Sequence, residues 1–150
     1  MTHYPLFFKV SSSAGPSTLG SWTSALYPSE REPVLSLVAI PPEFEGPGGA
    51  YSPEDFYCLA LINCFVATFK VIAEKSKLNF KSLQCEGLLT VDLDEKGIPW
   101  MSAFRLKAIL LGASDVDRAK QILKKTSQSC MILNSVKTEK TFEWIVESEL

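Results

Sequence analysis

Residues 52–73 read SPEDFYCLALINCFVATFKVIA, and this stretch dictates how the rest of the chain is arranged. Ser52 can cap a helix, and Pro53 suits the first helical position. The next two residues are acidic and favour the positive end of the helix dipole. From Phe56 to Ala73 the helix is apolar nearly all round, so it must be covered on most of its sides.

Strands are predicted before and after this helix. Alternating apolar side chains and turn residues predict three strands (4–10, 18–26 and 34–40), two turns (11–16 and 27–33) and a proline- and glycine-rich loop (41–49). After the helix the pattern predicts two long strands (about 83–93 and 98–110), the turn that joins them (95–97), a helix that starts at Ser114, and a strand with Phe142, Trp144 and Val146 on one face. The order βββ-α-ββ-α-β is typical of an α+β fold, here a single domain over residues 1–150.

The apolar helix predicts a partner. One six-stranded sheet would cover only one side of a helix that is apolar nearly all round. The simplest remedy is a homodimer in which the helix of one chain is buried against the second copy.

Composition excludes several functions. The 150 residues carry 15 Lys+Arg against 17 Asp+Glu, a net charge of −2, which argues against a nucleic-acid partner. The single histidine, His3, makes Ser-His-Asp and Cys-His catalysis improbable. No CxxC occurs and the cysteine spacings match no zinc site, so we expect neither a metal nor a cofactor.

The chain is expected to be a soluble cytoplasmic protein with no membrane partner. The apolar run 56–73 contains Asn63 and Lys70, and no basic leader precedes the first apolar residues. In that compartment the four cysteines are thiols at rest.

The four cysteines differ in their predicted surroundings. Cys85 lies on the inward face of a strand and is expected to fill the core, as is Cys58. Cys58 and Cys64 point about 120° apart on one helix and cannot pair. Cys64 lies midway along the buried helix, and Cys130 lies on the inward stripe of the second helix. The residues alone leave two interpretations of these two open, core packing or a redox role.

The local sequence resembles a known family. Residues 41–54 read PPEFEGPGGAYSPE and lead to Asn63-Cys64-Phe65. This combination resembles the OsmC/Ohr family of thiol peroxidases, the osmotically inducible protein C and organic hydroperoxide resistance proteins. A second family signature is matched loosely by Cys130-Met131-Ile132-Leu133-Asn134-Ser135. The resemblance covers most of the chain from about Val34 onward.

The resemblance implies an OsmC-like homodimer with two active sites at the subunit interface. Cys64 would be the peroxidatic thiol and Cys130 the resolving thiol. The substrate would be an organic hydroperoxide, and a dithiol would be the reductant. Apolar side chains near Cys64 would favour organic peroxides, and the candidates are Leu61, Phe65, Phe44 and Tyr51.

One departure from the family concerns a cation. The family places an arginine beside the reactive thiolate and orients it with an acidic residue, for which Glu54 is the match. Where the OsmC branch has the arginine this chain has Glu43, and residues 11–20 offer no basic side chain in its place. Arg31 is the nearest substitute in sequence, whereas Arg105 is predicted to be a solvated charge on the outward face of its strand.

Helix geometry constrains the role of Glu54. Ten residues of continuous helix place it about 15 Å from Cys64, so the two could cooperate only across two chains. A carboxylate near Cys64 with no cation would raise the pKa of the thiol and slow it. Two other interpretations therefore remain open: a non-catalytic dimer that binds an apolar ligand, and a thiol redox sensor.

Overall fold

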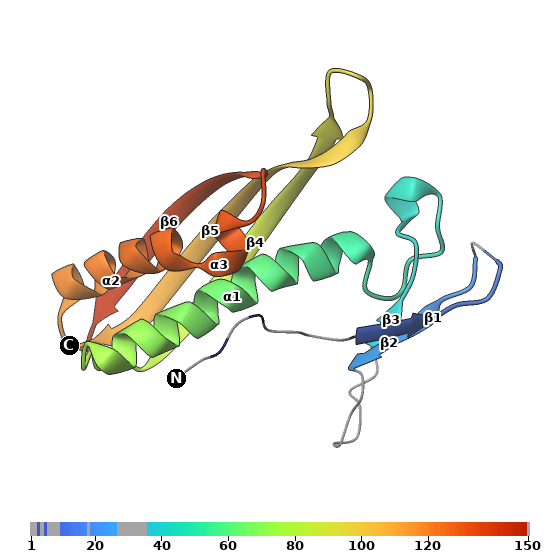
Figure 1. The fold of residues 1–150 in the computed structure, drawn as a ribbon. Coiled ribbons are helices and arrows are strands. Elements are labelled where there is room, and N and C mark those ends of the chain that lie inside the picture. Colours follow the sequence, from blue (N-terminus) through green and yellow to red (C-terminus); the bar gives the residue numbers. More distant parts are fainter. Residues whose placement is uncertain (1–2, 4, 6–9, 18, 27–35, 150) are drawn as a thin grey trace. The chain divides into compact units, whose positions relative to one another are not determined.

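The computed structural model describes residues 3, 5, 10–17, 19–26 and 36–149. Contacts divide the chain into two compact units, Met1–Phe56 and Tyr57–Leu150 (Figure 1). The single domain over residues 1–150 stays a prediction. The predicted α+β class and the order of the main elements are confirmed, with two short helices added.

The first unit holds a three-stranded antiparallel sheet in the order β1-β2-β3. Its strands are β1 (Val10–Ser13), β2 (Trp22–Leu26) and β3 (Ser36–Val38). Most of the strand predicted over 4–10 and the turn predicted over 27–33 lie outside the described residues. The turn predicted from residue 11 is wrong in its first part, because Ser12 pairs with Ser24 across the strands and their hydroxyl oxygens lie 2.7 Å apart.

The proline- and glycine-rich loop is more ordered than its composition predicts. A short 3-10 helix, η1 (Pro42–Phe44), is followed by Glu45 in the left-handed region at φ 60°. The loop closes on itself because the backbone N–H of Gly46 donates to the Pro41 carbonyl, at 3.0 Å. Gly46 is required here, since an added Cβ would lie 2.1 Å from the Ile40 carbonyl oxygen.

The predicted start of the central helix is confirmed. Helix α1 (Pro53–Lys75) begins with a reciprocal cap. Ser52 Oγ accepts from the backbone N–H of Asp55 at 3.0 Å, and Asp55 Oδ2 accepts from the backbone N–H of Ser52 at 2.8 Å. Both bonds satisfy donors that a helix start leaves without partners.

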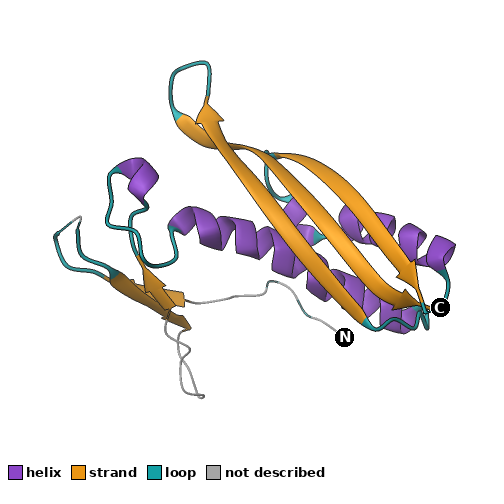
Figure 2. Cartoon of the chain, turned by 180° about the vertical axis from the view of Figure 1, so that it is seen from behind, coloured by secondary structure: helices purple, strands orange, loops and turns teal. Residues whose placement is uncertain are grey.

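The second unit is a three-stranded sheet with helices on one face (Figures 1 and 2). Its further elements are β4 (Ser82–Leu93), β5 (Pro99–Ala113), α2 (Val116–Ser129), α3 (Met131–Asn134) and β6 (Glu139–Ser148). Strands β4 and β5 form the predicted hairpin, whereas β6 runs parallel to β5 after the crossover through α2 and α3. The single six-stranded sheet is wrong for the described residues, which form two three-stranded sheets. Beyond its own sheet β3 makes one isolated parallel bridge, from Val38 to Tyr51.

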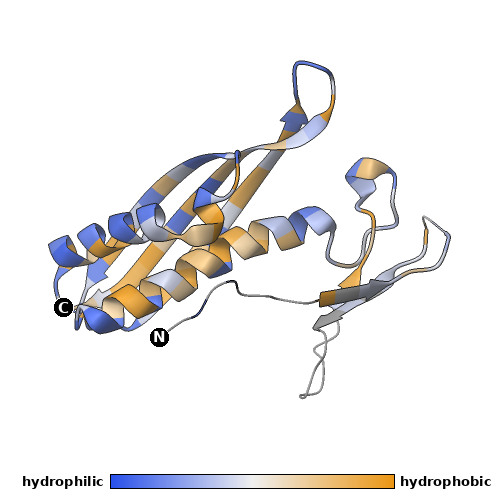
Figure 3. Cartoon of the chain, viewed as in Figure 1, coloured by the Kyte–Doolittle hydropathy of each residue, from blue (hydrophilic) through white to orange (hydrophobic). Residues whose placement is uncertain are grey.

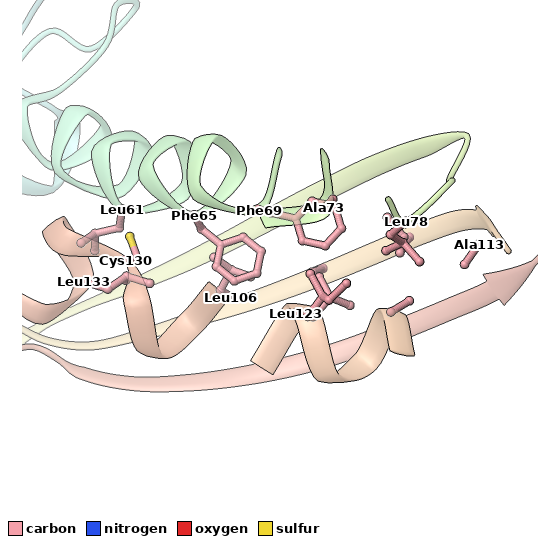
Figure 4. Close-up of a cluster of buried hydrophobic side chains, with 14 of the residues drawn as sticks. Leu61, Phe65, Phe69, Ala73, Leu78, Leu106, Ala113, Leu123, Cys130 and Leu133 are labelled. Atoms are coloured by element: carbon pink, nitrogen blue, oxygen red, sulfur yellow. The ribbon is translucent and has the colours of Figure 1, made fainter. Parts of the chain in front are cut away.

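The core of the second unit lies between α1, α2 and the sheet (Figure 4). Alternate residues of β5 face this core, and the fully buried side chains of α1 recur at helical spacing: Leu61, Phe65, Phe69 and Ala73. Phe65 stacks on Trp144 of β6 with ring centroids 5.6 Å apart. Gly87 of β4 lets the helix approach, since an added Cβ would lie 2.6 Å from Ile62 Cδ1.

The described residues cover α1 on one side only. Leu59, Ala60, Ala67 and Val71 are exposed. Figure 3 shows apolar residues on turn after turn of α1, whereas α2 carries many hydrophilic ones. By length and composition alone α1 could also cross a bilayer, a test that the core helix of a soluble protein passes too.

The far half of the β4–β5 hairpin, residues 88–101, forms an arm that we call the hairpin arm. Figures 1 and 2 show it extending beyond α2 and α3. Every residue from Val91 to Trp100 is exposed, and the arm carries large apolar side chains such as Leu88, 67% exposed, and Leu93, 61% exposed. Exposed apolar side chains gathered along one feature indicate a surface that binds a partner.

The buried stripe of α1 should dominate the stability of the second unit. Phe69→Ala is expected to lower the free energy of unfolding by about 3–5 kcal/mol, because it leaves a cavity against Phe80 and the sheet. Phe69→Leu should cost less, and Lys120→Ala on the exposed face of α2 should stay within about 0.5 kcal/mol. Urea unfolding measures all three; equal effects of Phe69→Ala and Lys120→Ala would contradict the packing.

Candidate two-cysteine site

Cys64 is held by the packing of α1 against the core. It lies between the buried residues Leu61 and Phe65 in sequence, and its own side chain is only partly buried. Leu61 and Phe65 are fully buried in the core, against which Cys64 packs. Cys64 therefore borders the core and keeps some exposure to solvent.

Cys130 occupies the break between two helices. It ends α2 and begins α3, with an extended backbone at φ −71° and ψ 114°. Its backbone N–H donates to the Thr126 carbonyl at 3.0 Å, and its carbonyl accepts from the backbone N–H of Asn134 at 3.0 Å. Asn134 Nδ2 also donates to the Gln128 carbonyl at 3.0 Å, which ties α3 to the end of α2. The backbone around Cys130 is thus fixed on both sides.

The two thiols meet across the core. The Cys130 side chain is fully buried, and Figure 4 shows its sulfur pointing toward α1. The interaction with Cys64 is one of the causes that raise the pKa of Cys130. Of the residues predicted for the site, Cys64 and Cys130 are the two that act on each other within one chain.

Burial sets the protonation of Cys130. Desolvation, followed by the interaction with Cys64, raises the pKa of Cys130 from 9.0 to about 11, although backbone N–H groups at the start of α3 act in the opposite direction. Burial likewise raises the pKa of Cys85 in β4 to about 11. Both thiols are therefore protonated near neutral pH.

A second polar contact lies on the same face of α1. The Tyr57 hydroxyl and Thr138 Oγ1 are 2.6 Å apart, and Thr138 is buried. Seven residues, almost two helical turns, separate Tyr57 from Cys64, so the two side chains share one face of α1. The sequence pattern did not predict this contact. The only signal for it was the seven-residue spacing that places Tyr57 on the same face of the helix as Cys64.

The charged residues predicted for the site are placed only in part. Glu54 lies in the first turn of the continuous helix α1, about 15 Å from Cys64 by helix rise. Its Oε2 atom is buried and has no hydrogen-bond partner among the described residues. Arg31 lies outside the described residues. Glu43 lies in η1, in the first unit.

Arg105 lies on the outward face of its strand, as predicted. Its Nη2 pairs with Glu143 Oε2 at 2.9 Å, and its side chain is largely exposed. Among the described residues, no group of three or more His, Cys, Asp or Glu side chains is placed to hold a metal ion. Within the described part of one chain the candidate site is therefore a pair of neighbouring thiols at the edge of the apolar core.

Comparison with known proteins confirms the resemblance. The OsmC-like protein family matches residues 46–145, and the chain belongs to this family. A curated relative, the uncharacterized protein YmaD of Bacillus subtilis, is 25% identical over 107 residues, 69% of this chain and 71% of that protein.

Solved structures share the fold. An OsmC-like protein of unknown function from Vibrio cholerae superposes with a TM-score of 0.80 at 18% identity, over 94% of this chain and all of its own. The organic hydroperoxide resistance protein OhrB of Bacillus subtilis gives 0.67 at 14% identity, over 94% of this chain and 98% of its own. At these identities the likeness to solved structures shows the fold of the chain alone.

The four thiols should differ in reactivity at neutral pH. With a pKa of about 11, only about one in ten thousand Cys85 or Cys130 side chains is ionised at pH 7. Limited iodoacetamide at pH 7 should therefore modify Cys64 before either of them, and their rates should rise about tenfold per pH unit up to about pH 10. Peptide mass mapping measures each site; rapid labelling of Cys85 or Cys130 at pH 7 would contradict the assignment.

Proposed function

We propose that this chain is a homodimeric, cysteine-dependent peroxidase that reduces organic hydroperoxides in the cytoplasm. The interaction between the Cys64 and Cys130 thiols, together with the burial of Cys130 facing α1, supports the proposal, because two neighbouring thiols can form a disulfide with little movement of the backbone. Membership of the OsmC-like family supports it. Cys64 is the peroxidatic thiol, since it is the partly exposed member of the pair, and Cys130 is the resolving thiol.

The proposed reaction has three balanced steps. The Cys64 thiolate attacks the terminal oxygen of the hydroperoxide, the O–O bond breaks, and the leaving alkoxide takes a proton to become an alcohol. The Cys64 sulfenic acid then condenses with the Cys130 thiol, which forms the S–S bond and releases water. A dithiol reductant reduces this disulfide by exchange: both cysteines return to thiols and the reductant becomes a disulfide.

A second copy of the chain would complete the site. The exposed side of α1 and the hairpin arm both present apolar side chains that the described residues leave uncovered. The buried Oε2 atom of Glu54 needs a hydrogen-bond donor, and a buried polar atom rarely stays without one. We propose that Glu54 orients a cation in the dimer and acts at the Cys64 of the partner subunit, with Arg31 as the candidate cation.

A second function is favoured by one observation. The OsmC-branch arginine is replaced by Glu43, and a thiolate without a neighbouring cation is disfavoured. The pair could then form its disulfide slowly and serve as a thiol redox sensor, or the dimer could bind an apolar ligand without catalysis. Catalytic turnover with a hydroperoxide and a dithiol separates the peroxidase from both.

Oxidation of the reduced protein tests the redox pair. One equivalent of tert-butyl hydroperoxide should remove two hydrogens and link Cys64 to Cys130, as measured by intact mass and peptide mapping. Cys130→Ser should stop at a sulfenic acid on Cys64, and Cys64→Ser should abolish oxidation. Cys85→Ala is the matched control and should form the disulfide as the wild type does. Thiols that stay reduced after prolonged exposure would exclude the peroxidase and the sensor.

The oligomeric state tests the proposed interface. Sedimentation at micromolar concentration should give a dimer. Val71→Lys should shift it toward monomer, because dimer formation would bury the lysine charge without a partner on the side of α1 that is exposed in the single chain. Lys120→Glu on the exposed face of α2 is the control and should stay dimeric. A monomeric wild type would refute the two-chain role of Glu54.

A further inference from the structure

The chain from Cys130 to Thr138, which we call the Cys130 segment, is attached to α2 at its start. The backbone N–H of Cys130 donates to the Thr126 carbonyl, and Asn134 Nδ2 donates to the Gln128 carbonyl, both at 3.0 Å. Both acceptors belong to α2. These bonds fix the segment to α2 and leave its attachment to α1 to other groups.

Little apolar surface holds the Cys130 segment in place. Leu133 and the Cys130 thiol are fully buried. Much of the remaining segment is exposed: Met131, Asn134, Ser135 and Lys137. A short piece of chain with few buried apolar contacts can open locally while the rest of the protein stays folded. One buried hydrogen bond is then a large share of what keeps such a segment closed.

A side-chain hydrogen bond joins the far end of the segment to α1. The Tyr57 hydroxyl and Thr138 Oγ1 lie 2.6 Å apart, and Thr138 is only 2% exposed. Tyr57 lies one helical turn before the buried Leu61 on α1. Figure 4 shows Leu61 and Leu133 at the same end of the core as Cys130, whose sulfur points toward α1. The segment is therefore bonded to α1 at its end and faces α1 at its start.

Hydrogen bonds within the segment connect its two ends. Beyond the backbone bond that closes α3, Ser135 Oγ donates to the Met131 carbonyl at 2.8 Å. Lys140 Nζ donates to the Val136 carbonyl at 2.9 Å, across the position of Thr138. These bonds stiffen the chain on both sides of residue 135, so we expect the segment to open as one piece.

We propose that Tyr57 and Thr138 are positioning residues for the Cys130 thiol, because their hydrogen bond keeps the Cys130 segment closed against α1. Without this bond the segment opens more often and exposes the thiol. The inference deepens the proposed function and rests on it, since a resolving thiol has to lie beside Cys64 when that residue becomes a sulfenic acid.

Access to Cys130 measures how often the segment opens, and this measurement needs no peroxide. A parent protein with Cys64→Ser avoids an adduct next to Cys130. Iodoacetamide at pH 8, followed by peptide mass mapping, gives the labelling rates of Cys130 and Cys85 in one sample. Burial raises the pKa of both thiols to about 11, and Cys85 lies in β4, across β5 from β6. The Cys130-to-Cys85 rate ratio therefore reports local opening, whereas global unfolding would expose both thiols.

Loss of either hydroxyl should raise this ratio. Tyr57→Phe keeps the ring and Thr138→Val keeps the side-chain shape. Each should raise the ratio about tenfold, because the remaining hydroxyl is left buried without a partner until the segment opens. The double variant should stay near the value of the single variants, since both substitutions break the same bond. Thr138→Ser keeps the hydroxyl and should stay within about twofold of the parent.

A matched control removes a hydrogen bond elsewhere. Ser127 Oγ donates to the Lys124 carbonyl within α2 at 2.6 Å, and Ser127→Ala should leave the ratio unchanged. An unchanged ratio in Tyr57→Phe would overturn the inference, as would a Thr138→Ser ratio as high as that of Thr138→Val. Two additive effects in the double variant would overturn it too. Urea midpoints check the fold of each variant, and Tyr57→Phe decides the outcome if Thr138→Val does not fold.

The anchoring role and the proposed function can fail separately. A Cys64–Cys130 disulfide formed with tert-butyl hydroperoxide, together with an unchanged ratio in Tyr57→Phe, would overturn the anchoring role and leave the peroxidase standing. A raised ratio in Tyr57→Phe and Thr138→Val, in a protein whose wild type no hydroperoxide oxidises, would support the anchoring role and remove the peroxidase.

Discussion

The packing of α1 across the sheet of the second unit is the contact on which the other features depend. Four side chains at helical spacing, from Leu61 to Ala73, meet the alternating inward residues of β5. Their burial supplies the apolar driving force, and it also orients the whole helix. Cys64 lies one residue before Phe65, so the packing of the core alone determines where this thiol lies. A shift of one residue in the helix would turn the thiol away from Cys130.

Reactivity and burial are divided between the two thiols. Cys130 is enclosed in the core, and burial raises the pKa of its thiol, so it stays protonated near neutral pH. Cys64 borders the same core but keeps contact with solvent. One cysteine can hardly be both accessible to a substrate and enclosed in the low-dielectric core. In this pair Cys64 is accessible and Cys130 is enclosed.

The sequence predicted features that depend on local pattern. The capped start of α1, the hairpin turn before Gly97 and the inward stripe of α2 follow from spacing and turn chemistry. The three serines of β1 were predicted as a turn because serine is common in turns, yet they pair with β2, a partner that the local sequence does not indicate. The parallel pairing of β6 with β5 and the bond between Tyr57 and Thr138 depend on residues far apart in the chain, which periodicity cannot connect. The contact of Cys64 with Cys130 was reached only through the family resemblance.

The crossover that makes β6 parallel to β5 has a consequence for folding. The Tyr57–Thr138 contact spans 81 residues, and the Phe65–Trp144 stack joins similarly distant parts of the chain. Each such contact closes a long loop and costs the conformational entropy of that loop, so these contacts form late and slowly. Until β6 pairs with β5, the sheet that covers the buried side of α1 is incomplete. During synthesis, this helix is therefore the segment of the second unit most in need of protection from aggregation.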